Sequence, residues 1–115
     1  MKLDSLAHLH DIAQAGTAIC HFTAGKCRED YLTDELLRSA VERKFAVIGE
    51  ALTRLRRDDP ATLSQIRHSR EIISFRNILI HGYDAVDDRI VWDIIASDLP
   101  DLLVDVQALL GPPLQ

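Results

Sequence analysis

The stretch with the clearest chemical potential is Arg76–Tyr83, which reads RNILIHGY. It places a permanent cation, Arg76, and a titratable imidazole, His81, at the two ends of an apolar run. An imidazole that titrates near neutral pH can serve as a general base or a general acid. A guanidinium stays charged and offers a planar fork of N–H donors to phosphate oxygens. The pair could therefore move protons and stabilise charge at a phosphate group.

Each residue of this stretch also has a purely structural interpretation. Arg76 falls on an apolar helix face, where a charge is not buried without a partner. It either pairs with an acid such as Glu50 or points into a cleft. His81 could be a C-terminal helix cap, and Tyr83 could be a core or interface aromatic. Asn77 could orient Arg76 or a phosphate, or it could cap the backbone locally.

The spacing of the two candidate catalytic residues restricts how they can meet. Five residues along an ideal helix turn by about 500°, so Arg76 and His81 would point roughly 140° apart. They converge only if the helix unwinds near His81, and Gly82 is placed to permit that.

Helical periodicity runs through almost the whole chain and predicts an all-α, up-and-down bundle of four long helices and one short helix. We expect a single domain over residues 1–115. The first helix is expected to end near Gly25. The second is expected to run from an N-cap at Thr33 to the Asp-Asp-Pro at 58–60.

Individual glycine, proline and aspartate residues predict further features of the helices. Gly49 inside the second helix suggests a close helix–helix approach, and Pro100 inside the last helix predicts a kink or short break. Gly82 can terminate the fourth helix, which reaches His81. The predicted starts are Asp59 with Pro60 for the short helix, Ser69 for the fourth, and Asp87 or Asp88 for the last.

Composition narrows the function classes. The net charge of −5 argues weakly against nucleic acid as a partner, but residues 38–81 carry nine Lys/Arg against five Asp/Glu, a balance of +4 inside an acidic chain. No apolar run approaches a membrane span, and the N-terminus does not resemble a signal peptide, so we expect a cytoplasmic protein. Cys20 and Cys27 fit no zinc or redox spacing and are interpreted as free thiols. No metal site or cofactor is predicted.

The order of Arg, four residues, His, one residue and Tyr resembles the signature of the HEPN superfamily, and RNILIHGYD resembles its HepT-like subfamily. The resemblance extends over nearly the whole chain. DYLTDELLRSAVERKFAVIGEAL is similar to that family's second helix, and VDDRIVWDIIASDLPDLL is similar to its last.

This resemblance implies a homodimer of HEPN-like bundles that acts as a toxin and cleaves RNA without a metal. Arg76 and His81 would be catalytic, with Asn77 in support. The resemblance also implies an antitoxin partner, a small nucleotidyltransferase of the MNT type, which can transfer AMP to Tyr83. One histidine cannot be base and acid at once, so the chemistry itself favours two copies across a dimer axis.

Two other interpretations stay open. The chain could be a non-catalytic partner that presents Tyr83 or a substrate to a nucleotidyltransferase, and its overall acidity favours that. It could also be a structural helical dimer, which leaves an arginine on an apolar face unexplained. The presence of both Arg76 and His81 favours the enzyme.

Overall fold

The computed structural model describes residues 1–81 and 86–112. Every regular element of the described residues is helical, so the all-α prediction is confirmed. The elements are α1 (Leu3–Thr23), α2 (Arg28–Thr33), α3 (Glu35–Asp58), α4 (Pro60–Leu63), α5 (Ser69–His81), α6 (Asp88–Asp93), the π-helical turn η1 (Ile94–Asp98) and α7 (Leu99–Leu110).

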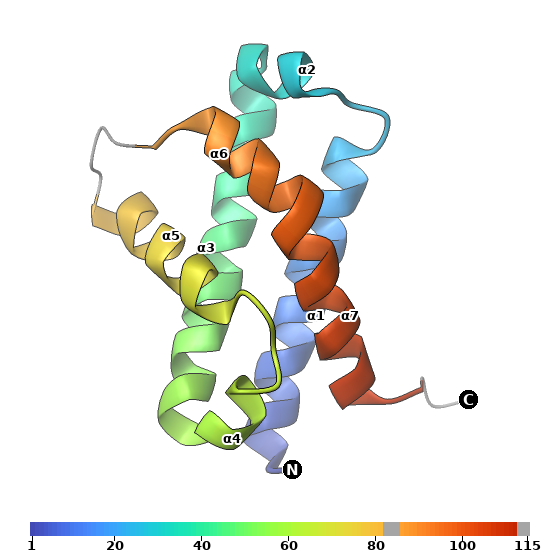
Figure 1. Ribbon diagram of the computed structural model, residues 1–115, viewed down its shortest axis with the longest axis vertical. Coiled ribbons are helices and arrows are strands. Elements are labelled where there is room, and N and C mark those ends of the chain that lie inside the picture. The colour runs from blue at the N-terminus through green and yellow to red at the C-terminus, as the bar shows by residue number, and fades with distance from the viewer. Residues whose placement is uncertain (82–85, 113–115) are drawn as a thin grey trace.

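The long helices alternate in direction, as an up-and-down bundle requires (Figure 1). The main contacts join α1 to α3, α3 to α5, and α1 to α7. The α1–α3 pair therefore forms the centre, with α5 covering one side and α7 the other. The short helices α2 and α4 close opposite ends of the bundle (Figure 1).

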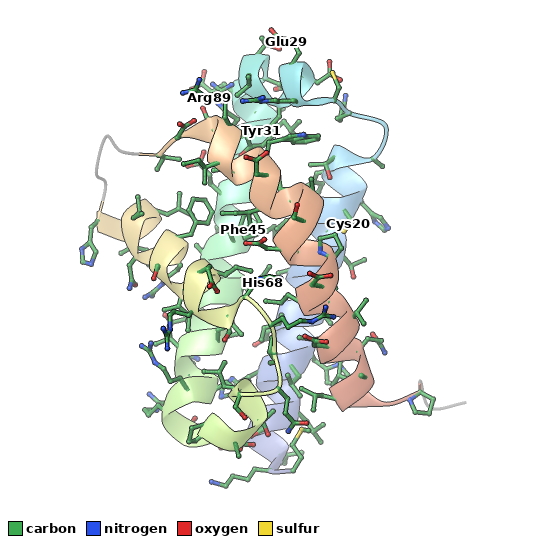
Figure 2. The ribbon with its side chains drawn as sticks, in the orientation of Figure 1. Cys20, Glu29, Tyr31, Phe45, His68 and Arg89 are labelled. Carbon is green, nitrogen blue, oxygen red and sulfur yellow. The ribbon has the colours of Figure 1, made fainter. Side chains whose placement is uncertain are left out.

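The buried apolar side chains form one cluster, to which all the long helices contribute. Phe45 of α3 and Phe75 of α5 meet edge to face in it, with ring centroids 5.3 Å apart. At the α2 end, Tyr31 is fully buried and its ring lies 5.7 Å from that of Trp92 on α6 (Figure 2). The Phe45–Phe75 pair attaches α5 to the central helix α3, and thereby helps to fix where α5 presents its side chains, while the Tyr31–Trp92 pair joins α6 to α2.

Aspartate side chains cap the starts of three helices, α3, α4 and α6. Asp59 caps α4 as predicted, and of the two residues predicted for the start of the last helix, Asp87 is the cap of α6. The prediction that Thr33 caps the second long helix is wrong by one residue. Asp34 is the cap, and its carboxylate accepts a hydrogen bond from the Leu37 amide at 3.1 Å. Thr33 instead ends α2, a short helix that the periodicity did not predict, and its hydroxyl donates to the Glu29 carbonyl at 2.9 Å.

The fourth predicted helix also begins slightly differently. Ser69 is the first helical residue of α5 rather than its cap, because the carbonyl of His68 accepts from the Ile72 amide. His68 has φ 65°, a left-handed conformation that is uncommon outside glycine. The sharp turn between α4 and α5 is made there.

The break expected at Pro100 is present as η1, which joins α6 to α7. The amide of Leu99 bonds to the carbonyl of Ile94, five residues back instead of four. Pro100 has no N–H to donate to the carbonyl one turn earlier. The wider turn of η1 shifts the hydrogen-bond register around this missing donor.

Candidate functional site

A cleft of about 510 Å³ opens between α1, α3 and α5, on the face of the bundle where α5 presents Arg76. Its lining is mostly polar and charged, and α3 contributes most of it. The lining residues are His8, Asp11, Arg43, Ala46, Val47, Glu50, Ala51, Arg54, Arg76 and Ile80.

Arg76 both pairs with an acid and lines the cleft, so the two interpretations of this residue hold together. Its Nη2 donates to Oε2 of Glu50 on α3, the acid suggested by the sequence. The Arg76 side chain is 20% exposed, and its Nε is buried with no hydrogen-bond partner among the described residues. A guanidinium held this way keeps a fixed direction while part of it stays open to the cleft.

Gly49 allows Arg76 to lie this close to α3. A Cβ built on residue 49 would overlap Cβ and Cγ of Arg76. The close helix approach predicted from Gly49 is therefore confirmed, and its point of contact is the candidate catalytic arginine.

Glu50 links two arginines. Its Oε1 accepts from Nε of Arg54 at 3.0 Å, one helical turn further along α3, while Oε2 holds Arg76. One carboxylate between two guanidiniums leaves a net charge of about +1 and offsets the repulsion between the cations. Both arginines retain N–H groups that Glu50 does not occupy.

Asn77 touches Arg76 but not the cleft. Its Oδ1 accepts from Nη1 of Arg76 at 3.3 Å. The contact restrains the outer end of the guanidinium. Asn77 could therefore orient Arg76, which is one of the roles suggested by the sequence.

His81 ends α5 and is exposed. It does not line the cleft as far as the described residues define it. Because α5 is α-helical through His81, the unwinding that would turn this residue toward Arg76 is not seen within residues 69–81. Gly82 and Tyr83 lie outside the described residues. One copy of the chain thus places Arg76 in a cleft and His81 at the end of the same helix.

The sequence interpretation missed several cleft residues. Arg43 and Arg54 follow the face of Glu50 at helical spacing, and that stripe was visible in the sequence. His8 and Asp11 come from α1 and could be found only once the packing of α1 on α3 was known.

His8 lines the cleft beside Asp58, with Nε2 3.5 Å from Oδ2, and this nitrogen is buried without a hydrogen-bond partner among the described residues. The hydrogen bonds from Arg57 are the main cause that lowers the pKa of Asp58, to about 2, and nearby His8 contributes less. Asp58 is therefore a carboxylate at neutral pH, and it places a negative charge beside the His8 ring.

Within the described residues, no group of three or more His, Cys, Asp or Glu side chains could hold a metal ion. None of the helices in that part of the chain is both long and apolar enough to cross a membrane. Cys20 and Cys27 are free and exposed, as predicted.

Comparison with known proteins shows which sequences this chain is similar to. The family model "Ribonuclease HepT-like" matches residues 12–109. The chain is 37% identical over 102 residues to "Probable ribonuclease HepT" of Thermococcus cleftensis, covering 89% of this chain and 92% of that protein. It is 29% identical over 106 residues to a candidate RNase of Methanocaldococcus jannaschii, covering 92% and 96% of the two chains. A candidate RNase of Caldanaerobacter subterraneus is 31% identical over 103 residues, with 90% and 91% covered. No solved structure matches the chain significantly.

Proposed function

This chain belongs to the HepT-like ribonuclease family, and we propose that it is the toxin of a toxin–antitoxin pair, cleaving RNA through Arg76 and His81. As a member of that family it is a ribonuclease. The observation that supports the finer assignment is the position of Arg76, fixed by Glu50 and Gly49 at a solvent-open cleft in an otherwise acidic chain.

The proposed reaction is transfer of the phosphoryl group to the neighbouring 2′-oxygen. A base removes the 2′-hydroxyl proton as that oxygen attacks phosphorus. The bond to the 5′-oxygen then breaks, and an acid returns a proton to the leaving oxygen. The products are a 2′,3′-cyclic phosphate and a 5′-hydroxyl.

Arg76 suits the charge that develops in this reaction. A guanidinium fork can contact two non-bridging phosphate oxygens at once and is already oriented before substrate arrives. Loss of one such donor typically costs about 3–4 kcal/mol of transition-state stabilisation.

His81 supplies proton transfer, and the reaction needs two such groups. A homodimer in which the α5 helices lie near the axis would provide two copies of His81, one as base and one as acid. This arrangement also removes the need for Arg76 and His81 of one copy to converge on the same side of α5.

The proposed partner is an MNT-type nucleotidyltransferase that silences the toxin by transferring AMP to Tyr83. An added phosphate beside the site would compete for Arg76 and repel an RNA phosphate. The nucleoside would block access sterically.

Purified chain incubated with end-labelled RNA in EDTA tests the catalytic assignment. We expect cleavage that leaves a 2′,3′-cyclic phosphate or its opened form. Arg76→Ala and His81→Ala should each abolish it while the circular dichroism spectrum stays that of wild type. Arg76→Lys should fail as well, because an ammonium lacks the bidentate fork. An inactive wild type would instead favour a non-catalytic partner of the nucleotidyltransferase, and a requirement for magnesium would refute the metal-independent mechanism.

A further inference from the structure

The cleft holds more positive charge than cleavage at one phosphate requires. Besides Arg76, it is lined by Arg43 and Arg54 of α3. Steps of seven and four residues separate Arg43, Glu50 and Arg54, so all three lie on one face of the helix. Three arginines face two acids, Asp11 and Glu50, in a chain whose net charge is −5.

We propose that Arg43 and Arg54 form a binding track for the RNA backbone, which holds phosphates on either side of the one that is cleaved at Arg76. The identity of the ligand rests on the proposed function. The track itself rests on the geometry of α3 and on the cleft between α1, α3 and α5.

The length of the track indicates an extended polyanion. Arg43 and Arg54 are eleven residues apart on α3, which is about 16 Å at 1.5 Å per residue. A single phosphate cannot contact both ends of such a stripe, whereas successive phosphates of one strand can. Both side chains are exposed, so a strand lying along α3 could reach them.

Glu50 organises the track by holding two of its cations together. It accepts from Arg54 at 3.0 Å and also pairs with Arg76, so these two guanidiniums sit on either side of one carboxylate. Neighbouring phosphates could then be received by donors that are already in place, at a smaller entropy cost than free arginine side chains would pay.

Arg43 has a different environment from Arg54. It makes no ion pair or hydrogen bond with the residues that the structure describes. None of the described residues therefore neutralises the charge of Arg43. A phosphate group that bound there would pair with the guanidinium.

Binding can be tested without cleavage by using a labelled, single-stranded 2′-O-methyl RNA, which lacks the attacking hydroxyl. Fluorescence anisotropy gives Kd over a salt series from about 50 to about 200 mM. Arg43→Gln and Arg54→Gln should each weaken binding and flatten the slope of log K against log salt by about 0.7. Over that fourfold salt range each variant should lose about 2.6-fold less affinity than wild type. Arg54→Lys should keep the wild-type slope, since it keeps the charge.

Arg56→Gln is the matched control, because Arg56 is an exposed arginine of the same helix that does not line the cleft. Its slope should equal that of wild type. The track is refuted if Arg43→Gln and Arg54→Gln also keep the wild-type slope, or if Arg56→Gln flattens it equally. It is refuted too if the cleft variants retain RNA binding but lose a protein partner.

The two proposals can fail separately. A wild type that binds the oligonucleotide with the expected slopes but cleaves no natural RNA would leave the track standing and overturn the catalytic assignment. Normal cleavage by the wild type, together with wild-type salt slopes in Arg43→Gln and Arg54→Gln, would overturn the track and leave the catalytic assignment standing.

Discussion

Gly49 of α3 lies directly against Arg76 of α5, so that any side chain at residue 49 would overlap Cβ and Cγ of the arginine. The position of Cβ is fixed by the backbone of α5, so no rotamer change of Arg76 can relieve this overlap. The distance between α3 and α5 therefore depends on the absence of a side chain at this one position. The same contact places Arg76 within reach of Glu50.

Gly49→Ala is expected to damage the site more than the fold. Overpacking costs about 1–3 kcal/mol, and alanine regains about 1 kcal/mol of helix propensity, so the free energy of unfolding should fall by no more than about 2 kcal/mol. Cleavage should fall about 100-fold, because a displacement of about 1 Å in a positioning contact can cost that much. Urea unfolding and the cleavage rate measure the two effects.

Gly16→Ala is the matched control for that variant. A Cβ at residue 16 would meet the methyl groups of Leu103, with Cδ2 at 2.5 Å. These are the far end of a flexible side chain on α7, which can turn away. We expect wild-type cleavage in Gly16→Ala. Equal loss of activity in both variants would mean that general loosening, and not Arg76, explains the effect of Gly49→Ala.

A second prediction concerns assembly. The chain should be a homodimer, and light scattering at micromolar concentration should give twice the monomer mass of 12.9 kDa. If one site uses His81 from both copies, adding His81→Ala protein should poison wild-type dimers. At a 1:1 ratio, with free exchange of subunits, about one quarter of the dimers keep both histidines, and activity should follow that fraction. A monomer mass would contradict the dimer. Activity that falls only in proportion to the dilution of the wild-type protein would contradict the shared site.

Much of this fold could be predicted because its signals are local. Asp59 with Pro60 and Pro100 act through the hydrogen bonds of adjacent turns, and both signals were interpreted correctly from the local sequence. The start of α6 was narrowed by the same kind of signal to Asp87 or Asp88, and Asp87 is the cap. Gly49 was informative because a glycine inside a helix needs a reason.

The remainder depended on contacts distant in sequence. The helix α2 has only six residues, too few for a periodic pattern, and it forms where Tyr31 becomes buried against α6. The cleft could not be outlined from the sequence either, because His8 reaches it from α1 through packing on α3. Arg76 and Glu50 were paired correctly because a charge on an apolar face requires a partner.

The third prediction is a pH dependence of stability. The His68 ring, before α5, has Nε2 3.0 Å from Oδ2 of Asp101 on α7 (Figure 2). This hydrogen bond, aided by nearby acids, raises the pKa of His68 above its usual value of 6.5. A raised pKa in the folded state means that the contribution is fully present below the unfolded pKa and disappears as pH rises through the folded one.

His68→Asn removes the titrating group but keeps a residue that tolerates the left-handed backbone at this position. The difference in Tm between wild type and His68→Asn should be larger near pH 5.5 than near pH 8.5. Asp101→Asn should reduce the same pH dependence. An equal Tm difference at both pH values would show that the His68–Asp101 pair adds no charge-dependent stability.

The last prediction concerns Tyr83, two residues after the end of α5 at His81 and outside the described residues. Tyr83→Phe keeps the ring but removes the hydroxyl that would accept AMP. The variant should cleave RNA like wild type, and the nucleotidyltransferase should no longer silence it by modification. Co-expression followed by mass spectrometry should show one or more AMP increments on the peptide that contains Tyr83. The chain supplies its own control, because its other tyrosine, Tyr31, is fully buried and should stay unmodified. A silenced wild type with unmodified Tyr83 would mean that the partner inhibits by binding alone.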